Sequence, residues 1–211
     1  MIISLLAVVI SGCGNPFPPD LSSLEPGRRV SLLNNRDLFG WKVLSGDFYE
    51  EAGKVEFKNG ILVVGAGDPM TGIGWKGEVP RNNYEINLTG RRVKGDDFFC
   101  GLTFPVGDGF ATLILGGWHG STVGISNING FPANQNPATT YINFENGRWY
   151  EISLKVADGR ITVTLDGRKI ISQVIEGRIF DVWPQQTESR PLGIATYSTR
   201  GEFKKITFKK L

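Results

Sequence analysis

The sequence has little cysteine, little histidine and almost no net charge. Its 211 residues include two cysteines and one histidine, and the formal net charge is +2. Two cysteines are too few for the disulfide framework of a small secreted scaffold. A nucleic-acid partner would leave a clustered basic footprint, and this chain has none. We therefore expect a domain held together by an apolar core, without a nucleic-acid partner.

Helix-period segments are also nearly absent, whereas glycine is abundant, with 28 residues. Apolar and polar residues alternate with period two through residues 147–171, which indicates strands with one buried face. Asp158-Gly159 and Asp166-Gly167 divide this stretch and suit type I′ turns, because both central residues need positive φ. The pattern predicts a three-stranded meander, and such a meander needs a second sheet to cover its apolar face.

The rest of the chain supplies further short strands. On the order of a dozen strands in one domain are typical of a two-sheet antiparallel jelly-roll sandwich, an all-β fold. We expect a hairpin between residues 47–51 and 54–57, and a strand over 97–104 that ends at Pro105. Other predicted strands lie at residues 61–64, 84–88, 110–115, 123–125, 141–144, 192–197 and 203–208.

The N-terminal residues have the features of an export signal. Residues 1–12 are apolar and uncharged but too short to span a bilayer as a helix. Ile10-Ser11-Gly12-Cys13 resembles a bacterial lipobox, which predicts a signal peptide over 1–12 and a lipidated Cys13. Residues 13–28 would then be a tether and 29–211 the sandwich. No Lys or Arg precedes the apolar run, which departs from the signal-peptide pattern and leaves open whether the true start lies upstream. A hydrophobic N-terminal strand is the alternative.

Five segments in order resemble one family. They are residues 31–41, 83–88, 147–150, 165–167 and 191–211. They are similar to the 3-keto-disaccharide hydrolase-like domains. This resemblance implies a concanavalin A-like lectin/glucanase sandwich and hydrolysis of glycosidic bonds in 3-keto sugars. We expect a monomer with a carbohydrate ligand. With the lipid predicted at Cys13, it would be a lipoprotein of the cell envelope, outside the cytoplasm, that meets the membrane only through this lipid.

One strand departs from the family pattern. Where the family has Glu, Gln and Asp in a groove, this chain has Ala111, Leu113 and Gly116. Loss of a general acid or base typically costs about 10²–10⁴-fold in rate. We therefore keep three alternatives: a glycoside hydrolase, a carbohydrate-binding member without catalysis, and a structural or interaction domain of the envelope.

Two residues are candidates for proton transfer. His119, in Gly-Gly-Trp-His-Gly, is the only histidine, and histidine exchanges protons near neutral pH. Glu145 is a second candidate. Either could remove the C2 proton beside a C3 ketone, so that the aglycone leaves by elimination. The alternative for His119 is a loop residue bonded to backbone or water.

Aromatic and acidic residues are candidates for substrate contacts. Trp118 and Trp75 present flat faces that match the C–H face of a pyranose, although core packing is favoured for Trp75. Asp97 and Asp108 are further candidate contacts, and with Asp68 and Asp96 they could also hold Ca²⁺. No Asp-x-Asp-x-Asp-Gly run is present, so no metal site or other cofactor is predicted.

The remaining singled-out residues have structural expectations. Cys100 lies in an apolar run and is expected to pack in the core instead of acting as a nucleophile. Trp41 and Trp149 are assigned to packing. Trp183 precedes a proline in an irregular segment, and the sequence leaves its role open.

Overall fold

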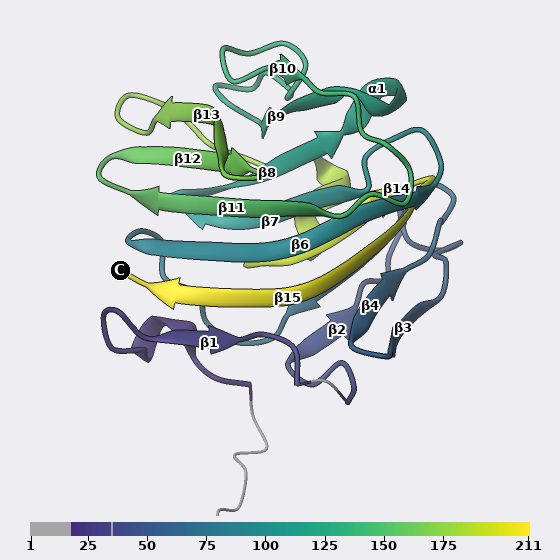
Figure 1. Ribbon diagram of the computed structural model, residues 1–211. Helices are drawn as coiled ribbons and strands as arrows, with labels where there is room; N and C mark the ends of the chain where they lie inside the picture. Colours follow the sequence, from purple (N-terminus) through teal and green to yellow (C-terminus); the bar gives the residue numbers. More distant parts are fainter. Residues whose placement is uncertain (1–17, 35) are drawn as a thin grey trace, which may run out of the picture.

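The protein is a sandwich of two antiparallel sheets (Figure 1). The computed structural model describes residues 18–34 and 36–211, so the predicted signal peptide and Cys13 lie outside the described residues. We name the eight-stranded sheet, ordered β13-β12-β11-β6-β15-β4-β3 with β1 also beside β15, sheet A. The seven-stranded sheet, ordered β10-β9-β8-β7-β14-β5-β2, is sheet B. The predicted all-β sandwich is confirmed.

The element bounds follow the chain from one sheet to the other. Sheet A contains β1 (Arg29–Ser31), β3 (Val55–Lys58), β4 (Ile61–Val64), β6 (Tyr84–Lys94), β11 (Tyr150–Ala157), β12 (Arg160–Leu165), β13 (Arg168–Val174) and β15 (Arg200–Lys210). Sheet B contains β2 (Trp41–Val43), β5 (Met70–Trp75), β7 (Cys100–Val106), β8 (Gly109–Gly116), β9 (Thr122–Ser126), β10 (Thr140–Tyr141) and β14 (Gly193–Tyr197). The short helical segments are η1 (Leu21–Ser23), α1 (Gly117–Gly120) and η2 (Pro184–Ser189).

The meander of β11, β12 and β13 forms one side of sheet A, as the alternation predicted. Asp158 and Gly159 have φ of 54° and 67°, and Asp166 and Gly167 have φ of 49° and 77°. These positive values at both central positions match the expected turns. The apolar residues of β11 and β12 are buried against sheet B, namely Tyr150, Ile152, Leu154, Val156, Ile161, Val163 and Leu165.

The main core lies between the two sheets, and two singled-out residues belong to it. Cys100 is fully buried there, which confirms its packing role. Trp75 is 2% exposed and packs edge to face on Trp41, with ring centroids 5.1 Å apart. The candidate substrate contact at Trp75 is therefore wrong, because its ring has no face open to a ligand.

Three strand predictions are also wrong. Of the predicted strand 141–144, only Tyr141 belongs to a strand, at the end of β10. Pro105 does not end its strand: it lies within β7 opposite Phe110, beyond the point where β14 stops pairing at Thr103. A proline there loses no ladder hydrogen bond on that side. Residues 47–51 form turns, and β3 pairs with β4 across Asn59-Gly60 instead.

The orientation of β8 overturns the expectation for the family's acidic positions. Ala111 and Leu113 are fully buried in the core between the sheets, so they do not line a groove. Because side chains alternate along a strand, Phe110, Thr112 and Ile114 face the other way, onto the outer face of sheet B. The absence of carboxylates at Ala111 and Leu113 therefore says nothing about a groove.

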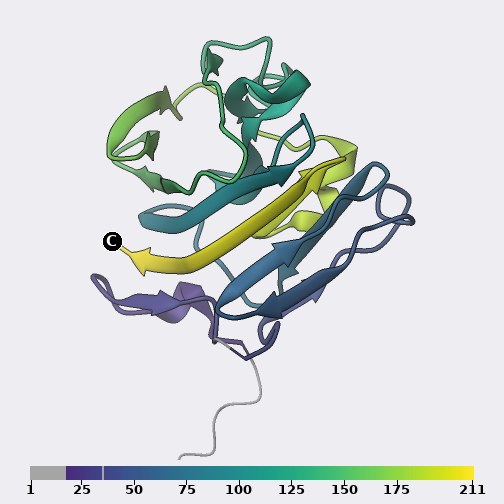
Figure 2. The ribbon, with the colours of Figure 1, turned by 45° about the vertical axis from the view of Figure 1, so that its right-hand side comes forward.

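A segment that we call the strap, residues 179–191 including η2, crosses the outer face of sheet B. Figure 2 shows its yellow-green ribbon behind β15. Backbone bonds link Asn127 and Asp181, and the Tyr49 hydroxyl donates to the Gln185 carbonyl at 2.9 Å. Gln186 is 4% exposed, and its Oε1 accepts from the Thr103 hydroxyl at 3.4 Å. The strap is thus a packed part of the fold that leaves sheet B accessible only beside it.

Candidate functional site

A pocket of about 240 Å³ lies where β8 ends and the strap begins. Its floor includes Ile114 from the outer face of β8. Four aromatic side chains line it: Phe98, Trp118, Trp183 and Tyr197. Its polar lining consists of Asp97, Ser126, Gln185 and Gln186. The pocket therefore combines flat apolar walls with one carboxylate and two side-chain amides.

The aromatic residues form two pairs from four separate segments. Trp118 of α1 meets Trp183 of the strap edge to face, with ring centroids 5.7 Å apart and an interplanar angle of 78°. Phe98 and Tyr197 are tilted by 47°, also with centroids 5.7 Å apart. Trp183 is 37% exposed and Tyr197 36%, whereas Phe98 is buried. Trp183 and Tyr197 thus leave aromatic surface open to a ligand.

A left-handed turn carries Trp118 into the pocket. Trp118 has φ 46° and His119 has φ 67°, and Gly116 and Gly120 on either side also have positive φ. Side chains other than glycine are unfavourable in this region and need support from their surroundings. Asp97 supplies it, because its carboxylate accepts from the backbone N–H of Phe98 at 2.7 Å, and the backbone N–H groups of Trp118 and His119 are close enough to lower its pKa.

Arg92 holds the other side of the same turn. This arginine is 8% exposed and donates to the carbonyls of Gly120 and Phe144 and to Oδ1 of Asn146. The buried guanidinium thus ties α1 to the segment that follows β10. The strained turn is fixed from both sides, so Trp118 is presented in one orientation.

The Asp97 carboxyl group has an unusual environment for an acid. Burial raises its pKa, and the neighbouring Asp96 adds to this, while the three backbone N–H groups oppose the shift. No ion pair to Asp97 occurs among residues 18–34 and 36–211. Gln185 adds a second acceptor, because its Oε1 is buried and has no hydrogen-bond partner. The pocket therefore contains two acceptors, the Asp97 carboxylate and Gln185 Oε1, that have no charged donor as a partner among the described residues.

Residues 28–209 match the family model described as the 3-keto-alpha-glucoside-1,2-lyase-like domain. The chain belongs to this family. The resemblance drawn from the five sequence segments is thereby confirmed. No curated protein sequence is significantly similar to the chain.

Three of the solved structures similar to this chain come from carbohydrate-binding or carbohydrate-degrading proteins. The carbohydrate-binding module CBM66 from Bacillus subtilis has a TM-score of 0.52 and 14% identity, covering 81% of this chain and 96% of that one. Domain 4 of the GH43 arabinanase AbnA from Geobacillus stearothermophilus, in complex with arabinotriose, has a TM-score of 0.55 and 14% identity, covering 88% and 94%. A laminarinase from Flavobacterium sp. UMI-01 has a TM-score of 0.55 and 9% identity, covering 89% and 100%. At these identities the likeness concerns the fold.

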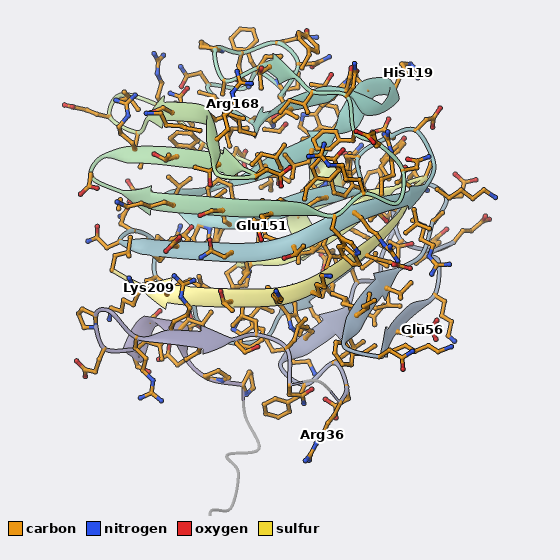
Figure 3. The ribbon with its side chains drawn as sticks, viewed as in Figure 1. Arg36, Glu56, His119, Glu151, Arg168 and Lys209 are labelled. Atoms are coloured by element: carbon orange, nitrogen blue, oxygen red, sulfur yellow. The ribbon has the colours of Figure 1, made fainter. Side chains whose placement is uncertain are left out.

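The lyase-like domain brings only two of the sequence-predicted site residues together. Trp118 and Asp97 both line the pocket. His119 is exposed and lies at the outer edge of the molecule (Figure 3), away from the pocket lining. The Glu145 side chain is 76% exposed and pairs with Arg148 at 3.6 Å.

Asp108 cannot share a site with Trp118. It is exposed in the turn that precedes β8, whereas Trp118 follows the other end of that strand. At about 3.3 Å per residue the eight-residue strand separates them by roughly 25 Å.

No group of three His, Cys, Asp or Glu side chains that could hold a metal ion occurs in the described part of the chain. Within the same residues, no helix is long and apolar enough to cross a membrane.

Sequence reasoning missed Tyr197 and Gln185 and left Trp183 undecided. These residues belong to β14 and the strap, which lie far from Trp118 in the sequence. The one available signal was the irregular, proline-bounded segment from 179 to 191, because ordered loops of that length are often functional. Periodicity alone does not show that this segment folds over the end of β8.

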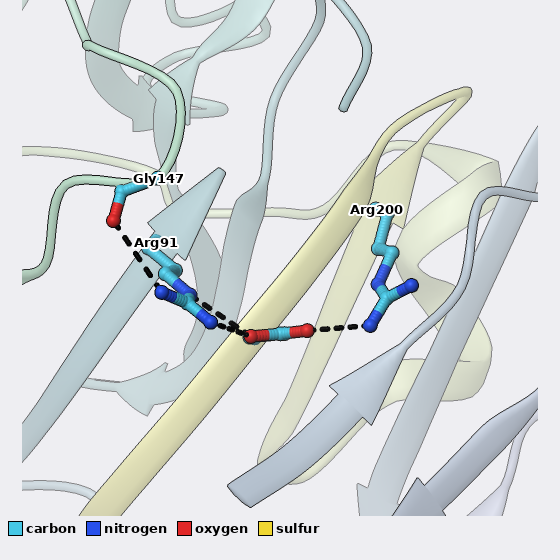
Figure 4. A network of polar contacts seen from close by, with 4 residues as sticks. Arg91, Gly147 and Arg200 are labelled. Carbon is cyan, nitrogen blue, oxygen red and sulfur yellow. Dashed lines mark hydrogen bonds and ion pairs between the residues drawn. The ribbon is translucent and has the colours of Figure 1, made fainter. Parts of the chain in front are cut away.

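The outer face of sheet A is polar and has a larger, shallower hollow of about 480 Å³. Its lining includes Glu85, Asn87, Ser153 and Lys205, and no aromatic side chain. Near it Glu202 accepts from both Arg91 and Arg200, at 2.6 Å each (Figure 4). Without an aromatic surface this hollow is less suited to a sugar than the pocket beside Trp118.

Proposed function

We propose that this lyase-like domain binds carbohydrate in the pocket between Trp118 and Trp183. The observation that carries the proposal is the meeting of open aromatic surface with polar acceptors in one small hollow. A pyranose has an apolar C–H face and a polar rim, so aromatic walls and the Asp97 carboxylate would complement both. A volume of about 240 Å³ lies below the roughly 300–1,000 Å³ of sites for drug-sized ligands. The pocket therefore suits about one sugar ring.

The proposal is supported by the family and by the fold that the chain shares with carbohydrate-related domains. A carbohydrate-binding module and an arabinanase domain in complex with arabinotriose have the same fold. Their low identity means that their ligands are not transferred to this chain. The support lies in the agreement between that fold class and the lining of the pocket.

Direct hydrolysis with two carboxylates receives no support from the pocket. Glycosidases place two carboxyl groups roughly 5–9.5 Å apart on either side of the scissile bond. Asp97 is the only carboxylate that lines this pocket. The candidate pair of His119 and Glu145 does not supply the missing group, since neither side chain lines the pocket.

Elimination from a 3-keto glycoside is the second candidate function, because it needs one base. The C3 ketone acidifies the C2–H bond, Asp97 would take that proton, and the electron pair forms the C1–C2 double bond as the C1–O bond breaks. The aglycone leaves with the bonding electrons and is protonated by water. The raised pKa of Asp97 favours this role, since a more basic carboxylate accepts a proton more readily.

Binding is tested by titrating the full chain with a panel of mono- and oligosaccharides, followed by isothermal calorimetry. Trp183→Ala should lower the affinity for the most tightly bound sugar about tenfold, as expected when one stacked aromatic face is lost. Trp149→Ala is the matched control, because Trp149 stacks under Arg91 and Lys204, outside the pocket lining. Equal affinity of both variants, or no binding of any sugar, would contradict the proposal.

Elimination is tested with an aryl 3-keto-glucoside and release of the phenol. Asp97→Asn should lower the rate by at least about 10²-fold. Unchanged release in that variant, or no release by the native chain, would remove elimination and leave binding as the function.

Export as a lipoprotein completes the proposal and rests on the sequence around Cys13 alone. Metabolic labelling with a fatty-acid analogue in a bacterial host should label the native chain and not a Cys13→Ser variant. Equal labelling of the two would count against a lipid tether.

A further inference from the structure

The pocket is lined by one carboxylate and four aromatic rings, and by no basic side chain. No Lys, Arg or His belongs to its lining. The two amides and the Ser126 hydroxyl are its other polar groups, and Ser126 already donates to Asn127 at 2.7 Å. A neutral sugar could use these groups, but no positively charged side chain lines the pocket to pair with an acidic one. The only charged side chain in the pocket lining is therefore the Asp97 carboxylate, which is negative when ionised.

We propose that the pocket selects a sugar with a free, protonated amine, an amino sugar, over its neutral and acetylated counterparts. This inference rests on the proposed carbohydrate function. The ammonium group would lie between the aromatic pairs and beside Asp97, as in the aromatic cages that bind organic cations. Protein cations outside the pocket already show the preference of such rings, because Arg91 and Lys204 both stack on Trp149.

The dimensions allow this arrangement. A cation is attracted by an aromatic ring when it lies within about 6 Å of the centroid. A sphere of about 240 Å³ has a radius of roughly 4 Å, so a group inside this pocket stays within that range of its walls. The Trp118–Trp183 and Phe98–Tyr197 pairs line the same space, so an ammonium there would lie beside aromatic rings.

The carboxylate lacks the cation that an ammonium would provide. Asp97 is partly buried and receives only backbone N–H groups, which are neutral donors. Burial removes water from the Asp97 carboxylate. A bound ammonium would place a full positive charge beside it instead, which stabilises the ionised carboxylate. The buried Oε1 of Gln185 has no partner in the described chain, and it offers a further acceptor for an N–H or O–H donor.

The test compares three hexosamines with their parent hexoses and N-acetyl derivatives, and adds choline as an ammonium without a sugar. We expect one hexosamine to bind at least about tenfold more tightly than its hexose and its N-acetyl form. Equal binding of the three forms would overturn the inference and leave the carbohydrate function standing. Binding of choline alone would overturn the carbohydrate function and the inference that depends on it.

Two variants identify the groups responsible. Asp97→Asn keeps the size of the side chain and should reduce the amine preference, measured as the ratio of hexosamine affinity to hexose affinity, to near unity. Asp96→Asn is the matched control, since the neighbouring Asp96 is exposed and does not line the pocket. Because Asp97 also supports α1, Tyr197→Leu provides a second route: it should reduce the preference severalfold without touching that turn. Retention of the full preference in Asp97→Asn, or in both variants, would overturn the inference.

Discussion

Trp118 and Trp183 pack edge to face with their ring centroids 5.7 Å apart, although neither residue belongs to a strand. Trp118 lies in the left-handed turn after β8, and Trp183 lies just before η2 in the strap. The aromatic wall exists only when both irregular segments are in place. The sheets position these segments, and the segments provide the chemistry, which is the usual division between a rigid scaffold and its loops.

His119→Gly should preserve sugar binding and leave the fold as stable or more stable. His119 has φ 67°, where glycine is unstrained, and its exposed side chain does not line the pocket. Relief of strain is partly offset by the greater freedom of glycine in the unfolded chain, so we expect a gain of 0 to about 1 kcal/mol in unfolding free energy. Urea denaturation and calorimetric titration measure the two quantities.

A loss of sugar binding in His119→Gly, with the fold intact, would contradict this assignment and restore His119 as a functional side chain. His119→Ala is the companion variant, because it removes the imidazole but keeps the backbone strain. Loss of binding in both variants would implicate the imidazole, whereas loss in His119→Gly alone would implicate the backbone of the turn.

Glu202 should make the fold sensitive to acid. Its side chain is 6% exposed, and hydrogen bonds from Arg91 and Arg200 hold its pKa below the usual 4.5 despite the opposing effect of burial. Because the folded-state pKa is the lower one, this contribution is fully present above the unfolded value. It is lost as the pH falls from about 4.5 through the folded value. Denaturation at a series of pH values measures the slope.

Glu202→Gln isolates this contribution. At pH 7 we expect a loss of about 2 kcal/mol, below the roughly 3–5 kcal/mol for fully buried pairs, because both arginines remain partly exposed. Below the folded pKa the variant and the native chain should approach each other in stability. A difference that stays constant from pH 7 to pH 3 would show that Glu202 acts through packing and not through its charge.

The three-stranded meander and its buried face followed from alternation and turn residues, whereas the site did not. Period two correctly assigned Tyr150 and Ile152 to the core, because one sheet covered them. The same rule could not say which face of β8 carried Ala111, since both faces of that strand are apolar and both are covered. A motif match supplied the wrong face there. The strap, which covers the outer face of β8, has no hydrophobic periodicity from which its position could be predicted.

Cys100 should resist thiol reagents in the folded protein. It is fully buried, and burial raises its pKa to about 12. Only the thiolate reacts, so both access and ionisation are suppressed at pH 8. In a Cys13→Ser background we expect no labelling by a chromogenic disulfide within an hour, and one equivalent after addition of denaturant. Fast labelling without denaturant would mean that β7 opens in the native state.

Ala111→Glu tests which way β8 faces. The substitution installs an acid at the position that the family pattern would place in a groove, but Ala111 is 0% exposed between the sheets. An unpaired buried carboxylate should cost at least about 4 kcal/mol or prevent folding. Phe110→Glu is the matched control on the neighbouring residue, whose ring lies 4.6 Å from the Arg81 guanidinium and 5.6 Å from that of Arg190. There the new carboxylate would face two arginines, and we expect a cost of about 1 kcal/mol from lost packing. Equal stability of the two variants would contradict this orientation of β8. Ala111 would then face outward, and Ile114, which now lines the pocket floor, would face the core.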